Sequence, residues 1–548
     1  MSVSTIAETI PAQERPASGR RGRWVDGAAL VILWVVLAAP NTVAEFGWEM
    51  ALRLPIEMLA VGVLALVLPR AAVRPVGIGL GLFLALVSVT KVLDAGFLVS
   101  FGRLSRPPWD WAYLDSGIDL LTVAVGRPQA LLFTGVAAAV VLLVLVSVPW
   151  AVTRSLRVLG RDRRLTGRMI LALGLAWILL LGWSRAGGRA PVQPSAATAT
   201  VTADHVALLW NGLRDQRTFD AAVAVDPLQA IPDDALLSTL RGKDVLVIFV
   251  ESYGRVALQN PGVDAVLAAG TDRLSERGFE TRSAYVSSPT FGGISWLAHS
   301  TLQSGVWVDS QQRYDRLLGM PRSTLSSTFA RAGWRTVSHV PSNEQPWGEG
   351  ERFYGFDKTY DATNVGYEGP RFGYSTMPDQ YVLDVFGRKE LAPSPRQPVM
   401  AEIDLASSHT PWTPLPPLVP WSQVGDGSIF HRIPALGPSK DDLWRDADAV
   451  RAAYGASIEY SVTSVIEFIE KYGDPNLVVL MLGDHQPSTI VSGVDGGHDV
   501  PVSLIAADPR VLLAIDSWGW DPGLRPGQDA PVTGMGSLRD AFVTAQSG

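Results

Sequence analysis

The sequence predicts a membrane-anchored α/β protein, in which a five-helix transmembrane N-terminal domain precedes an extracytoplasmic α/β domain with a mostly parallel sheet. Only 18% of the 548 residues are charged and 47% are hydrophobic, whereas soluble domains carry about 25% charged residues. The apolar excess lies in the first third of the chain, and short apolar runs separated by a helical pattern begin near residue 241. These patterns predict a cytoplasmic tail (1–25), five transmembrane helices (26–186), a linker with helices (187–240) and the α/β domain (241–548).

Five apolar runs predict the transmembrane helices. A helix needs about 20 apolar residues to cross the hydrocarbon core, so the second and fifth runs require residues from their flanks. So many apolar runs in so short a stretch are hard to bury inside a soluble protein. The runs are 27–44, 54–68, 76–92, 130–152 and 169–183.

The arginines orient these helices. Twelve precede the first run or lie in every second loop, against four in the alternate loops, and basic residues favour the cytoplasmic side. The N-terminus is therefore expected in the cytoplasm, and everything after residue 186 outside the membrane. The twelve are Arg15, Arg20, Arg21, Arg23, Arg70, Arg74, Arg154, Arg157, Arg161, Arg163, Arg164 and Arg168, and the four are Arg53, Arg103, Arg106 and Arg127.

Composition excludes several classes of chemistry. The chain has no cysteine, which rules out disulfides, thiolate metal sites and a cysteine nucleophile. Its net charge of -7 provides no overall basic field for nucleic acid, so no nucleic-acid partner is expected.

The strands of the predicted α/β domain are continuous apolar runs, which are typical of strands buried on both faces. They cover 245–250, 399–405, 477–482 and 502–506, and residues 446–471 have helical periodicity. Strands that alternate with helices favour a mostly parallel sheet. Ligands of such sheets bind beyond the carboxyl ends of the strands.

Acidic and histidine side chains follow three of these strands. Glu251 follows the first, Asp484 and His485 follow the third, and His409 lies shortly after the second. Any one of them could be a helix cap or a solvated turn, but together they favour a metal site. Oxygen and nitrogen ligands suit Zn²⁺ or Mn²⁺.

A candidate nucleophile, Thr290, lies between the first two strands. Pro289 before it and the pair Gly292 and Gly293 after it predict a tight turn that opens a helix. A hydroxyl there could bind a metal and lie near backbone N–H groups that receive an anion. The alternative is an ordinary helix N-cap.

Four motifs in one order give the sequence a family resemblance: FVESYGR (249–255), SPTFGGISW (288–296), SSHTPW (407–412) and GDHQP (483–487). This set resembles the sulfatase-like branch of the alkaline phosphatase superfamily. By pattern it is similar to lipoteichoic acid synthases, phosphoglycerol transferases and phosphoethanolamine transferases. The resemblance covers nearly the whole chain. It implies a multi-pass protein of the bacterial plasma membrane with an extracytoplasmic catalytic domain.

The resemblance also implies roles for individual residues. Glu251, Thr290, Asp484 and His485 match the ligands of one divalent ion, Mn²⁺ or Zn²⁺, and Thr290 also matches the threonine nucleophile. His409 and His498 match histidines that contact the substrate phosphate and take part in catalysis. His339 and Trp347 resemble residues that hold glycerol phosphate in lipoteichoic acid synthases. The arginine that closely follows this tryptophan in those enzymes is displaced here, to Arg352.

The implied function is transfer of a phospholipid headgroup, of the phosphoglycerol or phosphoethanolamine type, to an envelope glycan or lipid through a phospho-threonine intermediate. The alternative is an extracytoplasmic phosphodiesterase, phosphatase or sulfatase-like hydrolase, because the acceptor pocket is not a motif. Formylglycine sulfatases require a C/S-x-P-x-R motif, which the site lacks. A non-catalytic scaffold and a transporter are weaker alternatives, since all four metal-site residues are present.

Overall fold

The computed structural model describes residues 20–42, 47–114, 117–118, 121–122, 126–187, 192–493 and 495–548. Most of the predicted cytoplasmic tail, including Arg15, lies outside these residues. The chain divides into two compact units. The first comprises Met1–Ala95 and Pro128–Leu209, and the second comprises Gly96–Arg127 and Trp210–Gly548.

The first unit is mostly helical, and each predicted apolar run forms a helix. Three of the described helices, α3, α5 and α6, are long and apolar enough to cross a membrane. Helix α2 has 12 residues and spans about 18 Å at 1.5 Å per residue, so the prediction of five spans is not confirmed. The elements are α1 (Arg20–Ala38), β1 (Arg53–Pro55), α2 (Ile56–Val67), α3 (Val73–Phe101), α5 (Arg127–Leu159), α6 (Arg163–Arg185), β2 (Gln193–Ser195) and α7 (Ala197–Ala224), of which α3, α5 and α7 extend into the second unit.

Helices α3 and α5 approach closely because small residues line their contact. A Cβ atom on Gly81 would lie 2.3 Å from the Cα atom of Pro149, and one on Gly77 would lie 2.7 Å from the hydroxyl of Thr153. Only glycine therefore permits this spacing. Small residues serve the same purpose between membrane helices in general.

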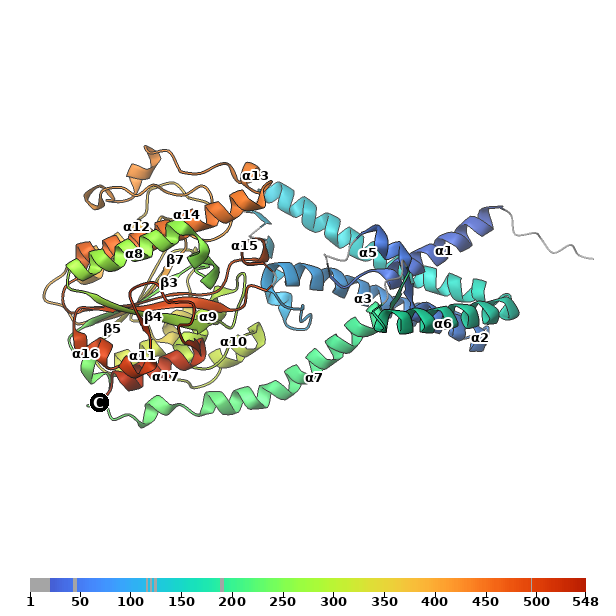
Figure 1. Ribbon diagram of the computed structural model, residues 1–548, viewed down its shortest axis with the longest axis horizontal. Helices are drawn as coiled ribbons and strands as arrows, with labels where there is room; N and C mark the ends of the chain where they lie inside the picture. Colours follow the sequence, from blue (N-terminus) through green and yellow to red (C-terminus); the bar gives the residue numbers. More distant parts are fainter. Residues whose placement is uncertain are drawn as a thin grey trace, which may run out of the picture. The chain divides into compact units, whose positions relative to one another are not determined.

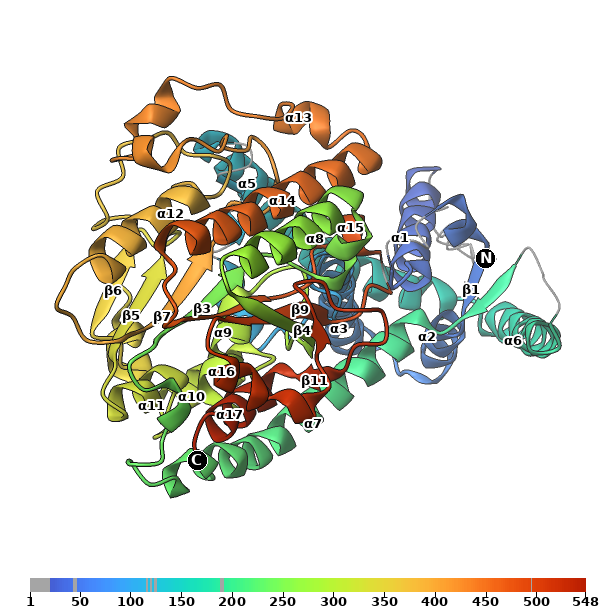
Figure 2. The same cartoon turned by 60° about the vertical axis from the view of Figure 1, so that its left-hand side comes forward.

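The second unit is a sheet covered by helices on both faces (Figures 1 and 2). Helices α8, α12 and α14 cover one face, and α9, α11, α16 and α17 cover the other. Its elements are β3 (Asp244–Val250), α8 (Pro261–Glu276), β4 (Glu280–Ser287), α9 (Ser295–Ser304), α10 (Gln311–Leu318), α11 (Leu325–Arg331), β5 (Arg335–Val340), β6 (Lys358–Asp361), α12 (Asp379–Phe386), β7 (Val399–Leu405), α13 (Lys440–Leu443), α14 (Ala447–Tyr472), β8 (Leu477–Gly483), α15 (Thr489–Ser492), β9 (Asp499–Ala506), α16 (Pro509–Leu513), β10 (Asp521–Pro522), β11 (Val532–Gly534) and α17 (Met535–Ala545).

Strand β3 shows why continuous apolar runs form this sheet. All seven of its residues are buried. Because successive side chains point to opposite faces, Leu246 and Ile248 join the core under α8 and α14, whereas Val247 and Phe249 join the core over α9 and α17. A polar residue at any of these positions would be buried on one face or the other.

The sheet is mixed, so the prediction of a mostly parallel sheet is not confirmed. Its order is β10-β4-β9-β8-β3-β7-β5-β6, and β11 pairs with β4. The five strands from β8 to β6 are parallel to one another, whereas β9 is antiparallel to both β8 and β4. Strand β9 therefore begins at the edge where its neighbours end.

Candidate active site

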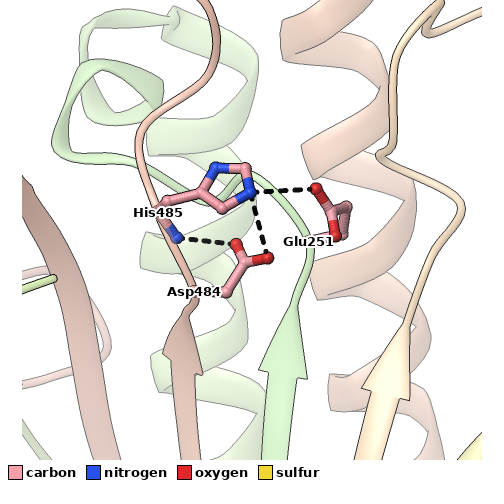
Figure 3. A group of neighbouring side chains, drawn as sticks. All are labelled: Glu251, Asp484 and His485. Carbon is pink, nitrogen blue, oxygen red and sulfur yellow. Dashed lines mark hydrogen bonds and ion pairs between the residues drawn. The ribbon is translucent and has the colours of Figure 1, made fainter. Parts of the chain in front are cut away.

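Glu251, Asp484 and His485 meet at the carboxyl edge of the sheet (Figure 3). Glu251 follows β3, and Asp484 and His485 follow β8, which is its parallel neighbour. The His485 Nε2 atom lies 3.4 Å from the Glu251 Oε1 atom and 3.4 Å from the Asp484 Oδ2 atom. The structure thus brings together three of the four predicted metal ligands.

The Asp484 carboxylate is held in place by one oxygen only. Its Oδ1 atom accepts the backbone N–H groups of Ser252 and His485, each at 2.7 Å. Its Oδ2 atom is buried and accepts no hydrogen bond from the described residues. Burial, and then the charge of Glu251, raise the pKa of Asp484 to about 6. A buried oxygen without a donor is costly and fits a cation ligand.

The His485 ring is oriented by the main chain. Its Nδ1 atom lies 2.8 Å from the Gln486 carbonyl oxygen, which can only accept, so Nδ1 carries the proton. The Nε2 atom then offers a lone pair toward the carboxylates, as in metal sites where a backbone carbonyl fixes the imidazole tautomer. The ligand atoms of all three residues lie within 4.8 Å of one another, so the set fits a Zn²⁺ or Mn²⁺ ion.

Two hydroxyls contact this cluster: Ser252 Oγ donates to Glu251 Oε1 at 2.9 Å, and Ser295 contacts both Glu251 and His485. The Ser295 Oγ atom donates to Glu251 Oε2 at 3.1 Å and lies 3.2 Å from His485 Nε2. Ser295 is the first residue of α9, which no side chain caps, and Ile294 before it has φ +66°. Positive φ at a non-glycine residue is strained and is often found at functional sites. The free N–H groups at this helix start favour an anion.

Thr290 occupies a different position. Its Oγ1 atom lies 3.4 Å from the hydroxyl of Ser288, and that hydroxyl donates to the Asp484 carbonyl oxygen at 2.5 Å. Thr290 is therefore connected to the cluster only indirectly, through Ser288 and the main chain of Asp484. Within the described part of the chain, the hydroxyl that contacts both the Glu251 carboxylate and the His485 imidazole is that of Ser295.

A cavity of about 530 Å³ opens beside the cluster. Glu251, Asp484 and Ser295 line it, together with the predicted substrate residues His409 and Trp347. Such a volume suits a small polar group such as a phosphorylated headgroup.

The displaced arginine, Arg352, is 77% exposed and pairs with Glu349 at 3.5 Å.

The ring of His409 is held by one stacking contact and one hydrogen bond. It stacks on Tyr374 with centroids 3.7 Å apart, and its Nδ1 atom donates to the Thr410 carbonyl at 2.6 Å. Burial, opposed by that carbonyl, lowers the pKa of His409 to about 4. The ring is therefore neutral near pH 7, and its Nε2 atom is a hydrogen-bond acceptor.

His339 and His498 lie elsewhere than the predicted substrate positions. His339 is fully buried in β5, neither ring nitrogen has a hydrogen-bond partner among the described residues, and burial lowers its pKa to about 3. His498 is exposed just before β9, and its Nδ1 atom donates to the Ser288 carbonyl at 3.1 Å. Neither is among the residues that line the cavity.

A second group of ionisable side chains also lines the cavity, and sequence reasoning missed it. His299 lies one helical turn after Ser295 on α9, and Glu402 and Asp404 lie on β7. Burial alone would lower the pKa of His299, but Asp404 and Glu402 outweigh it and raise the pKa to about 10. The available signal was the pair of acids, two residues apart, inside the apolar run VMAEIDL.

No protein-family model matches the chain, and no curated protein matches it. Similar solved structures include the lipoteichoic acid synthase LtaP from Listeria monocytogenes (14% identity, 58% of this chain and 76% of that chain, TM-score 0.33). They also include the phosphoglycerol transferase GacH from Streptococcus pyogenes with sn-glycerol-1-phosphate (14%, 61% and 82%, TM-score 0.37). A third is the C-terminal periplasmic domain of EptC from Escherichia coli with Zn (14%, 48% and 72%, TM-score 0.31).

Proposed function

We propose that this chain is a membrane-anchored, metal-dependent phosphotransferase that moves a phospholipid headgroup to an envelope acceptor. The observation that carries the proposal is the Ser295 hydroxyl, which lies at an uncapped helix start within hydrogen-bonding distance of both Glu251 and His485. A hydroxyl so placed is a candidate nucleophile for an anionic phosphoester.

Glu251, Asp484 and His485 would hold one divalent ion, Mn²⁺ or Zn²⁺. When bound, such an ion acidifies a neighbouring hydroxyl and offsets charge on the phosphoryl oxygens. In this proposal Ser295 takes the nucleophilic role predicted for Thr290, and Thr290 supports the loop through Ser288.

The proposed reaction has two steps. The Ser295 Oγ atom attacks phosphorus, the bond from phosphorus to the lipid oxygen breaks, and the proton of Ser295 passes to that oxygen, which gives the free lipid alcohol and a serine phosphodiester that carries the headgroup. The N–H groups at the start of α9 donate to the phosphoryl oxygens. An acceptor hydroxyl then attacks phosphorus and gives its proton to the neutral Nε2 atom of His409; the bond from phosphorus to Ser295 breaks, and the serine oxygen takes that proton from His409.

The proposed donor carries a phosphoglycerol or phosphoethanolamine headgroup, and the acceptor is an envelope glycan or lipid. Trp347 lines the cavity and is the residue that we assign to the transferred group. Anchoring by five N-terminal helices, with the N-terminus in the cytoplasm, would hold the site near lipid headgroups on the outer side of the plasma membrane.

Mass spectrometry of the full-length protein tests this function. After incubation with phosphatidylglycerol or phosphatidylethanolamine and acid quenching, the peptide that contains Ser295 should gain the mass of one phosphorylated headgroup. Release of the group to water alone, whatever glycan or lipid acceptor is added, would favour the hydrolase. An adduct on Thr290 would contradict the assignment of the nucleophile.

A further inference from the structure

The second ionisable cluster of the cavity consists of His299, Glu402 and Asp404. The His299 Nδ1 atom lies 3.1 Å from Glu402 Oε1 and 3.4 Å from Asp404 Oδ1. One ligand atom from each residue lies within 4.8 Å of the others. The ligand atoms of Glu251, Asp484 and His485 lie within the same limit.

The fold places these three side chains on one face. Residues two apart on a strand point the same way, so Glu402 and Asp404 both face the layer that contains α9. His299 meets them from that helix and is stacked against Phe249 of β3, with centroids 3.9 Å apart. Gln303, one turn further along α9, donates to the second oxygen of Glu402 at 2.6 Å. The cluster is thus held by packing and hydrogen bonds from the surrounding elements.

Protein cations balance the charge of the cavity only in part: the His299 ring pairs with Glu402 and Asp404, and Arg352 pairs with Glu349. Five carboxylates line it, from Glu251, Glu349, Glu402, Asp404 and Asp484, and none of the described lining residues is an arginine or a lysine. One divalent ion would offset Glu251 and Asp484 only. An anionic phosphoester would still face two carboxylates, Glu402 and Asp404, that share the single His299 ring, at a Coulombic cost that grows as water leaves the cavity.

Asp404 also has an oxygen without a hydrogen-bond donor. Its Oδ1 atom is buried and makes no hydrogen bond with the described residues, and its closest cationic group is the His299 ring at 3.4 Å. A buried carboxylate oxygen normally accepts hydrogen bonds or binds a cation. Together with the imidazole and Glu402, this oxygen completes a ligand set of one nitrogen and two carboxylates.

We propose that His299, Glu402 and Asp404 bind a second divalent metal ion, of the Mn²⁺ or Zn²⁺ class, in the same cavity as the first. An imidazole with two carboxylates suits these ions, and three protein ligands leave coordination positions open toward the cavity. The ion would give the phosphoester or its acceptor hydroxyl a cationic partner. That role rests on the function proposed above, whereas the presence of the ion does not.

Metal content tests this site without reference to activity. The full-length chain, purified in detergent, is equilibrated with Mn²⁺ or Zn²⁺, desalted and analysed for metal per protein. We expect two ions in the wild type, one in His299→Ala, one in Asp484→Asn, and none in the double variant. His431→Ala is the matched control, since His431 is exposed and contacts the Glu368 carbonyl, and it should keep both ions.

The near-isosteric Glu402→Gln substitution provides a second variant, and thermal unfolding identifies any variant that does not fold. Two results would overturn the proposal: a wild-type chain that binds no ion, or one that binds a single ion which His299→Ala and Glu402→Gln both retain. In either case His299 would be an imidazolium paired with two carboxylates. A chain that binds both ions yet transfers no phosphoester group would instead contradict the proposed function and leave this site standing.

Discussion

The assignment of Ser295 as nucleophile leads to a prediction that separates it sharply from Thr290. Ser295→Ala removes the atom proposed to attack phosphorus, and loss of a nucleophile costs about 10⁴-fold or more in kcat, which is about 5.4 kcal/mol of transition-state free energy. Thr290→Ala removes one hydroxyl contact of 3.4 Å to Ser288. Such a contact is worth about 1 kcal/mol, so we expect a loss of about fivefold at most.

The assay uses the full-length protein in detergent with a chromogenic phosphodiester, and it compares kcat for both variants. Because the Ser295 hydroxyl also contacts Glu251 and His485, the metal content of each variant must be measured in parallel. Ser295→Thr is the matched control, since it keeps a hydroxyl at the same position and should retain measurable turnover.

One pattern of results would refute this reasoning. If Ser295→Ala stayed within about tenfold of the wild type while Thr290→Ala lost about 10³-fold or more with normal metal content, Thr290 would be the nucleophile. The loop from Ser288 to Ile294 would then have to rearrange when substrate binds.

Three further predictions follow from the site and the fold. Removal of divalent metal with a chelator should lower the melting temperature of the wild type by more than that of Asp484→Asn, which keeps only the second proposed ion, because each ligand at 100 times its Kd stabilises by about 2.7 kcal/mol; an equal shift in both would place the ligands of the first ion elsewhere. Asp379 is fully buried, and burial raises its pKa to about 6, so its stabilising contribution is complete below the unfolded pKa of 3.8 and is lost as pH rises through about 6. Across that window the unfolding free energy of the wild type should fall by up to about 3 kcal/mol relative to Asp379→Asn; parallel pH profiles would disprove this. A reporter fused after residue 190 should be active only outside the cytoplasm, and cytoplasmic activity would reverse the proposed topology.

The sequence predicted the strands that are buried on both faces, and with them the first cluster. β3, β7 and β8 are uniform apolar runs, and the residues that follow them in the chain become neighbours because these strands are parallel. Two further internal strands are less uniform: β4 reads ETRSAYVS and β5 reads RTVSHV. Their polar residues interrupt the apolar run and conceal the strand pattern, although most of them are buried.

The direction of strand β9 could not be predicted from the sequence. The apolar pattern of β9 is the same for either direction, yet this strand is antiparallel to β8. Its first residues, rather than its last, therefore lie at the edge of the sheet where Glu251 and Asp484 stand. His498, which precedes β9, is brought to the loop of Ser288 for this reason, although no strand-end argument would place it there.

The position of the nucleophile depended on three backbone angles that residue types reveal only in part. Gly292, Gly293 and Ile294 all have positive φ. Gly292 and Gly293 predict a turn. Ile294 carries a side chain that disfavours positive φ, so the sequence gives no reason to extend the turn to this residue. The extra residue moves the start of α9 to Ser295, and the helix start decides which hydroxyl meets the anion-binding N–H groups. The same helix then presents His299 one turn later to the acids of β7. Both proposed site assignments that differ from the sequence prediction, Ser295 as nucleophile and His299 as metal ligand, thus depend on one feature, the left-handed Ile294 before α9.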